Sequence, residues 1–250
     1  MNITILKFDE IDSTNSEAMR QAGGGANEGL CIVARKQTAG RGRHGRVWES
    51  PEDAGLYFSI ILRPKIDYRF LPLLTLMAGI SVRDTLCEID LRPDIKWVND
   101  VLIDGKKISG VLAETVDTGD GVVVVLGIGI NIRDARFAWD VAHRATSIEN
   151  ETGRIVSAET LVQGLTKFLV YFYEMLNGSE GPSQIIDEWR RRSTYFSGKP
   201  VRVKMESETI SGVTDGLEAN GALRLRLHNG GVAVIQTGDV EQLREAANAH

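Results

Sequence analysis

The sequence has 250 residues, of which 42% are hydrophobic and 25% are charged, a composition typical of soluble globular proteins. Its net charge of −5 argues against a general nucleic-acid binder, because such proteins are more often basic overall. The length allows one large domain followed by a small one.

The cysteine content indicates a reducing compartment. The two cysteines, Cys31 and Cys87, each lie within an apolar pattern, which favours buried thiols over a catalytic or metal-binding pair. The segment from Met1 to Phe8 is too short and too polar for a signal peptide. We find no apolar run that approaches the length of a membrane span. We therefore expect a cytoplasmic protein with no membrane partner and no metal held by its own side chains.

The hydrophobic pattern predicts an alternation of strands and helices over the first three quarters of the chain. The second predicted strand ends in Gln37, and the first predicted helix follows Asp12-Ser13-Thr14-Asn15 with Glu17, a capping-box pattern. The turn residues Asp104-Gly105 predict a hairpin. Strands are expected at residues 3–8, 30–37, 56–62, 95–98, 107–115 and 122–130, and helices at residues 14–22, 71–89, 157–176 and 182–192.

The pattern changes after Ser197. Short alternating apolar segments are separated there by Gly216, Gly221, Gly230 and Gly238, which predicts a small all-β module, a barrel. We therefore divide the chain into residues 1–196 and residues 197–250.

The segment from Gly40 to Arg46 holds three arginines and three glycines in seven residues. Glycines let backbone N–H groups approach a ligand closely, and arginines offer forked donors that suit phosphate or carboxylate. The segment lacks the lysine and hydroxyl of a P-loop. We expect a loop that is mobile when empty and folds over an anionic ligand. On its own, this segment is more typical of a solvated basic loop or of an RNA-binding segment rich in arginine and glycine.

Two further segments place polar or flexible residues within apolar strands. Lys96-Trp97-Val98-Asn99-Asp100 puts a lysine in a short strand. Gly127 and Gly129 interrupt an apolar strand that ends at Asn131, and glycines within strands often mark the close approach of another backbone or a ligand.

These segments occur in one order along the chain, together with Gly110-Val111-Leu112-Ala113-Glu114. The order resembles that of the biotin protein ligases, or biotin–[acetyl-CoA-carboxylase] ligases, over nearly the whole chain. The resemblance implies an α+β fold with a mixed β-sheet backed by helices, a class II synthetase-like catalytic domain, and a C-terminal SH3-like barrel. Since the chain begins with the first catalytic strand, it is similar to the ligase-only class, which lacks an N-terminal DNA-binding domain.

The resemblance implies a reaction in two steps. The biotin carboxylate attacks the α-phosphate of ATP to give biotinyl-5′-AMP and pyrophosphate, and a lysine of a biotin carboxyl carrier protein then displaces AMP. Mg²⁺ is expected to accompany ATP, held by phosphate oxygens and water, with either assistance from Asp100 or a purely structural role for that residue. Family members often dimerise through a sheet edge, so the resemblance allows a homodimer but does not decide the oligomeric state, and we expect no DNA partner.

The resemblance also assigns roles to residues. Lys96 is expected to be a fixed charge between the carboxylate and the α-phosphate, and Arg41 and Arg43 are the other catalytic candidates. The expected biotin site consists of Ser13, Thr14, Asn15, Gln37, Gly40, Arg41, Arg43, Lys96, Gly110 and Gly129. The expected adenylate site consists of Arg43, Arg46, Trp48, Lys96, Asn99, Asn131 and Arg244, with Trp48 packed on the adenine.

One residue departs from the family pattern. Val98 stands where the family usually has proline, and we expect the strand geometry to survive because valine suits a strand. Two alternatives remain: a lipoate or octanoate protein ligase of the same fold, with a more apolar acyl pocket, and a biotin-responsive regulatory binding protein that uses the basic loop.

Overall fold

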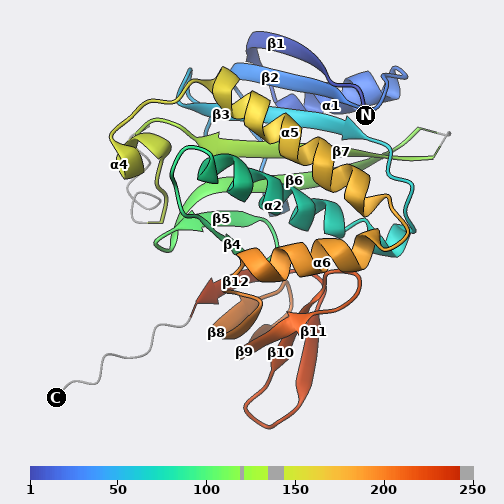
Figure 1. The fold of residues 1–250 in the computed structure, drawn as a ribbon, viewed down its shortest axis with the longest axis vertical. Helices are drawn as coiled ribbons and strands as arrows, with labels where there is room; N and C mark the ends of the chain where they lie inside the picture. The colour runs from blue at the N-terminus through green and yellow to red at the C-terminus, as the bar shows by residue number, and fades with distance from the viewer. Residues whose placement is uncertain (119–120, 135–143, 243–250) are drawn as a thin grey trace.

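A computed structural model describes residues 1–118, 121–134 and 144–242. A seven-stranded sheet forms the larger part, in the order β1-β2-β3-β7-β6-β5-β4 (Figure 1). Neighbouring strands are antiparallel except for β1 and β2, so the mixed sheet is confirmed. Its strands are β1 (Thr4–Ile11), β2 (Leu30–Gln37), β3 (Gly55–Leu62), β4 (Asp94–Lys96), β5 (Asp100–Ile103), β6 (Lys106–Asp117) and β7 (Val122–Asn131).

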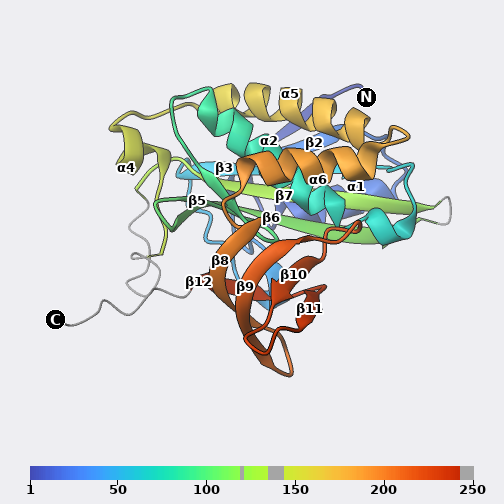
Figure 2. The same cartoon turned by 60° about the horizontal axis from the view of Figure 1, so that its bottom comes forward.

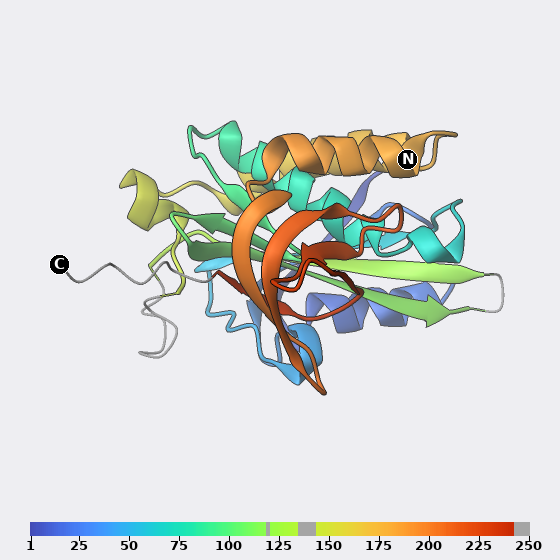
Figure 3. The same ribbon diagram turned by 90° about the horizontal axis from the view of Figure 1, so that it is seen from below.

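Helices cover both faces of this sheet. One face is covered by α2, α5 and α6, and the opposite face by α1, as the view from below shows (Figure 3). The helices are α1 (Thr14–Gly23), α2 (Leu73–Cys87), α4 (Ile148–Thr152), α5 (Ala158–Leu176) and α6 (Gly181–Arg192), with short 3₁₀ turns η1 (Arg43–Gly45) and η2 (Tyr68–Phe70).

The core explains why these segments adopt these structures. Every residue of β3 is buried, because the strand lies in the middle of the sheet with helices on both sides. Along α5, Leu161, Leu165, Leu169 and Phe172 recur at helical spacing and are buried. Burial of each such side chain contributes about 1.5–3 kcal/mol.

Two sequence expectations need correction. The strand expected through Val98 ends at Lys96, and residues 97–99 instead form the tight turn that pairs Lys96 with Asp100 in β5. The Trp97–Val98 peptide bond is cis.

The segment Tyr68–Cys87 is long and apolar enough, by length and composition, to span a membrane. We had expected no such segment. Most of it is buried within the core, as the central helix of a folded domain would be.

The C-terminal part is a five-stranded antiparallel sheet in the order β11-β10-β9-β8-β12, below the larger sheet (Figures 1 and 2). Its strands are β8 (Ser197–Lys204), β9 (Thr209–Leu217), β10 (Leu223–Arg226), β11 (Val232–Ile235) and β12 (Asp239–Gln242). The antiparallel module is therefore confirmed, while the strand pairing of residues 197–242 does not include closure of a barrel between β11 and β12.

The turn at Gly221 joins this sheet to the larger part. Trp97, only 2% exposed, donates its indole N–H to the Gly221 carbonyl at 2.9 Å. A Cβ at Gly221 would lie 2.9 Å from Leu73 Cδ2, so the turn packs directly on α2. A side chain from the larger part is thus hydrogen-bonded to the backbone of a turn in the C-terminal part.

Replacement of Trp97 by phenylalanine should lower the free energy of unfolding by about 1–3 kcal/mol beyond the loss of volume, because the buried Gly221 carbonyl loses its donor. The matched control is Trp189→Phe, since Trp189 is also fully buried but its indole N–H has no partner among the described residues. Urea unfolding of both variants measures the difference. Equal losses would show that the Trp97 hydrogen bond does not contribute.

Candidate active site

The segment from Gly40 to Arg46, here called the arginine loop, follows β2, which ends at Gln37, and folds back on itself as a small hairpin. Arg41 and Val47 form a β-bridge, and the N–H of Gly42 donates to the Arg46 carbonyl at 2.7 Å. The N–H of Trp48 donates to the Gly40 carbonyl at 3.0 Å. A Cβ at Gly40 would lie 2.2 Å from the Trp48 carbonyl oxygen, so this closure requires glycine.

The first turn of α1 brings a set of short polar side chains beside the loop. Gln37 Oε1 accepts hydrogen bonds from the Thr14 N–H at 2.7 Å and from Thr14 Oγ1 at 3.1 Å, so Gln37 caps the helix. The expected capping box is wrong: Ser13 is the N-cap residue but makes no side-chain capping bond, and Glu17 accepts from Arg20. The Ser13 hydroxyl, on the pocket wall, is left available to a ligand.

Asn15 is fixed by partners at both ends of its amide. Its Oδ1 accepts from the Ser59 hydroxyl at 2.6 Å, and its Nδ2 donates to Glu114 Oε2 at 2.9 Å. A Cβ at Gly127 would lie 2.0 Å from Asn15 Oδ1, so glycine in β7 makes room for it. Asn15 therefore shapes the pocket wall more than it offers free groups to a ligand.

Two glycines paired across β6 and β7 form the floor of the same pocket. Gly110 lies opposite Gly129, and the indole of Trp48 lies over both, since a Cβ at Gly129 would come 2.4 Å from Trp48 Cε2. Lys107 Nζ lies 5.3 Å from the centre of this indole. The Trp48 N–H is buried without a partner among the described residues.

The pocket therefore joins the first turn of α1, the loop and the glycine floor. Because Trp48 occupies much of it, its free volume is only about 50 Å³, enough for a few water molecules. A larger ligand must displace the indole. The lining residues are Ser13, Thr14, Asn15, Gln37, Arg41, Gly42, Arg43, Trp48, Tyr57, Phe58, Asn99, Lys107, Gly110, Val111, Leu112, Gly127, Ile128 and Gly129.

Two lysines share one largely buried carboxylate beside this pocket, that of Asp100, whose side chain is 15% exposed. Asp100 Oδ1 lies 2.6 Å from Lys107 Nζ, and its Oδ2 lies 2.7 Å from Lys96 Nζ. Burial alone would raise the pKa of Asp100, but the two ammonium groups outweigh it and lower this pKa to about 2. The aspartate is therefore ionised at neutral pH and fixes both cations.

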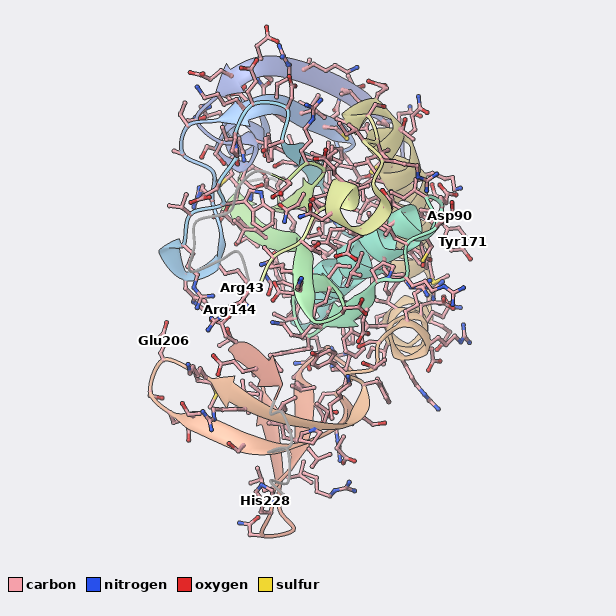
Figure 4. All side chains as sticks on the ribbon, turned by 90° about the vertical axis from the view of Figure 1, so that its left-hand side faces the viewer. Arg43, Asp90, Arg144, Tyr171, Glu206 and His228 are labelled. Atoms are coloured by element: carbon pink, nitrogen blue, oxygen red, sulfur yellow. The ribbon has the colours of Figure 1, made fainter. Side chains whose placement is uncertain are left out.

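Each loop arginine also has an internal acceptor. Arg41 Nη2 lies 2.6 Å from Glu114 Oε1. Arg43 donates to Asn99 Oδ1 at 3.2 Å and contacts the C-terminal sheet, toward which it lies in Figure 4. Arg46 pairs with Asp239. The cations expected to hold an anionic ligand are thus paired with, or hydrogen-bonded to, oxygen atoms of the protein.

The structure gathers most of the predicted site residues and places a few elsewhere. Lys96 and Asn131 are outside the pocket lining; Asn131 donates to the Thr146 carbonyl at 2.9 Å. Gly40 and Arg46 line a second hollow, which lies within the loop itself. Arg244 falls outside the described residues.

Two residues of this site were missed by the sequence analysis. Lys107 lines the pocket where Lys96 was expected, and Glu114 holds both Arg41 and Asn15. For Glu114, the sequence did contain a signal. Gly110, Leu112 and Glu114 alternate along β6, so the Glu114 carboxylate lies on the same face of the strand as Gly110. Lys107 gave a weaker signal, because its neighbour Lys106 is also a lysine and both follow a turn.

Comparison with known proteins identifies the family. Residues 8–131 match the biotin/lipoate A/B protein ligase family, and residues 196–241 match the biotin protein ligase C terminal domain. The bifunctional ligase/repressor BirA of Bacillus subtilis is 34% identical over 242 residues, which are 95% of this chain and 73% of the relative. The chain belongs to the biotin protein ligase family.

Other relatives agree with this assignment. The biotin–[acetyl-CoA-carboxylase] ligase of Paracoccus denitrificans is 34% identical over 86% of this chain and 91% of its own length. The biotin protein ligase of Aquifex aeolicus, solved in complex with biotin and ATP, superposes with a TM-score of 0.84 at 29% identity, covering 97% of this chain and 99% of that one. Both the mixed sheet and the C-terminal sheet of this ligase are therefore those of its family.

The Asp100 cluster predicts an acid-dependent stability of this biotin protein ligase. A carboxyl whose pKa falls from 3.8 unfolded to about 2 folded contributes about 2 kcal/mol above pH 4, and this contribution is lost as the pH falls from 4 to 2. Asp100→Asn should remove that pH dependence. Urea unfolding between pH 5 and pH 2 measures it, with Asp104→Asn in the exposed β5–β6 turn as control. A wild-type pH profile in Asp100→Asn would contradict this account.

Proposed function

We propose that this enzyme biotinylates a lysine of a biotin carboxyl carrier protein through biotinyl-5′-AMP. The observation that carries the proposal is the composition of one pocket, whose lining combines short polar side chains with three cations, Arg41, Arg43 and Lys107. A bicyclic urea with a carboxylate tail offers partners to both kinds of group. The Aquifex aeolicus relative, solved with biotin and ATP, supports the choice of ligands.

The polar side chains of the lining suit the ureido ring, which has one carbonyl and two N–H groups. Ser13 Oγ and one Gln37 Nε2–H are available to it, because among the described residues Gln37 Nε2 donates to Ser50 Oγ alone, at 2.7 Å. Thr14 and Asn15 are held in position by their own hydrogen bonds. A buried hydrogen-bonded urea discriminates strongly against analogues that lack it.

The three cations of the lining suit the first chemical step. Attack of a carboxylate on a phosphate brings two anions together, so the barrier falls when fixed cations lie between them. Lys107 is held by Asp100 at the pocket wall, and Arg41 and Arg43 reach the pocket from the loop. These groups orient the carboxylate and the α-phosphate and balance their charge as the acyl–phosphate bond forms and pyrophosphate leaves.

Trp48 would move when the ligand enters. The indole rests on Gly110 and Gly129 in the space that the ligand needs, and its N–H has no partner among the described residues that would be lost. We infer that it is displaced onto the adenine, where its large flat surface excludes water from the mixed anhydride.

Mg²⁺ is proposed as the partner of ATP. No cluster of three or more acidic, histidine or cysteine side chains that could hold a metal occurs within the described ranges. Both oxygens of Asp100 are occupied by lysines. The residues present therefore fit an ion that is held mainly by phosphate oxygens and water, with charge balance as its contribution.

Three wider expectations remain proposals. Two unpaired cysteines favour a cytoplasmic location. The family resemblance favours a homodimer formed through a sheet edge and no DNA partner.

The alternative of a lipoate or octanoate ligase keeps some support, because the family that matches residues 8–131 includes lipoate ligases. A linear acyl chain, however, would leave the polar side chains around Ser13 and Gln37 without hydrogen-bond partners.

Pyrophosphate release with ATP, Mg²⁺ and one acid at a time tests the substrate. We expect release with biotin and none above background with lipoate or octanoate, because only biotin of these three acids has a ureido ring to bond the polar side chains of the pocket. Release with lipoate alone would assign the enzyme to the neighbouring activity. If none of the three acids supported pyrophosphate release, the proposal of an acyl-adenylate would be overturned.

Alanine variants of the two lysines test which one serves the reaction. Lys107→Ala should reduce biotin-dependent pyrophosphate release by at least about 100-fold, the scale of losing one positioned charge at a transition state. Lys96→Ala should lose less, because Lys96 is outside the pocket lining and would act by holding Asp100. Single-turnover rates at saturating biotin and ATP compare them. A larger loss in Lys96→Ala would return the catalytic role to that residue.

A further inference from the structure

The turn between β11 and β12 of the C-terminal sheet lies against the arginine loop. Thr237 Oγ1 accepts from Arg43 Nη2 at 3.1 Å, and the Gly238 carbonyl accepts from Arg43 Nη1 at 3.4 Å. Asp239 pairs with Arg46 and lies 4.0 Å from Arg43. Two of the three loop arginines are therefore bound by three consecutive residues that are about 190 positions away in the sequence.

The C-terminal sheet holds these acceptors in fixed positions. Asp239 begins β12 and pairs with Lys204 of β8. Gly238 has a φ of 157°, and a Cβ there would lie 2.7 Å from Val203 Cγ1, so only glycine lets the chain turn this closely against β8. The turn is thus braced by the sheet and offers the loop a preformed set of oxygen atoms.

The electrostatic setting makes Asp239 the important member of this set. Arg43 is largely buried, and its desolvation lowers its pKa, while Asp239 is the first of the charges that raise it again. A buried cation without a nearby anion is costly, whereas Arg41 has its own partner in Glu114. The position of Arg43 at the pocket, and that of Arg46 within the loop, therefore depend on a carboxylate that the C-terminal sheet supplies.

We propose that Asp239, assisted by Thr237, is a positioning residue that holds the arginine loop closed over the pocket. Through it the C-terminal sheet controls loop order before any ligand binds, and it controls how well the reactive intermediate is retained afterwards. The second statement rests on the proposed biotin adenylation. The first does not, because it concerns the ligand-free protein.

Limited trypsin digestion of the whole ligand-free protein tests the first statement, since Arg41, Arg43 and Arg46 are themselves cleavage sites. In Asp239→Asn the loop should be cleaved about two- to fivefold faster than in the wild type, the range that one partly exposed ion pair contributes. Thr237→Val should give a smaller acceleration. Mass spectrometry of the fragments identifies cleavage within residues 41–46.

Glu241→Gln is the matched control. Glu241 lies on the same strand, β12, but pairs with Lys204 at 3.0 Å, away from the loop. It should be cleaved at the wild-type rate, and thermal unfolding midpoints show whether each variant is folded. Unchanged loop cleavage in folded Asp239→Asn and Thr237→Val, or equal acceleration in Glu241→Gln, would overturn the proposal.

Retention of the intermediate is the second readout. With biotin and ATP, Asp239→Asn should label lysines of a bystander protein several-fold more than Glu241→Gln, because an open loop lets the adenylate escape. If Asp239→Asn were cleaved faster but labelled the bystander no more, the second statement, on retention of the intermediate, would be overturned. The first statement, that Asp239 holds the loop, would stand. Failure of the wild type to adenylate biotin would instead count against the proposed function, and the digestion result would stand.

Discussion

The site depends on balancing a concentration of positive charge inside a protein that is acidic overall. Lys96 and Lys107 share Asp100, Arg41 rests on Glu114, and Arg46 rests on Asp239. Each carboxylate comes from a different strand, β5, β6 or β12. Cations this close together would repel one another without these partners, so the strand arrangement that supplies the carboxylates also allows the site to exist.

The same balance suits a reaction between two anions. Internal carboxylates and carbonyls hold the cations near the pocket before substrate arrives, and substrate oxygens can then take over some of these contacts with little change in net charge. The half-exposed pair of Arg41 with Glu114 is weakly bound compared with a buried one. A ligand carboxylate or phosphate can therefore replace this pair more readily than it can replace the Asp100 cluster, whose carboxylate is only 15% exposed and keeps its two lysines in place.

Much of the fold follows from local sequence pattern. The strand over Leu30–Gln37 and the helix ending at Leu176 have the boundaries that periodicity predicts, and the Asp104-Gly105 turn joins β5 to β6. Local pattern was less informative where tertiary contacts compete with it. Ser13 heads α1 without capping it, because Gln37 from β2 binds the first free N–H instead. The strand at Lys96 stops early, because the chain turns at Trp97 to pair Lys96 with Asp100.

The sequence alone determined which chemical groups were available: the glycine and arginine loop, the short polar residues at the start of α1, and the glycines that let side chains lie on the sheet. Their types are local properties, and most of them do meet in one pocket. Only the tertiary structure decided how they are paired, because charges find partners through space and not along the chain. Lys107 lines the pocket where Lys96 was expected, Glu114 joins Arg41 to Asn15, and Asp239 reaches Arg46 from the far end of the chain. No spacing in the sequence encodes these distances. Strand order and the position of α1 and of the loop on the larger sheet set the first two, and the packing of the C-terminal sheet sets the third.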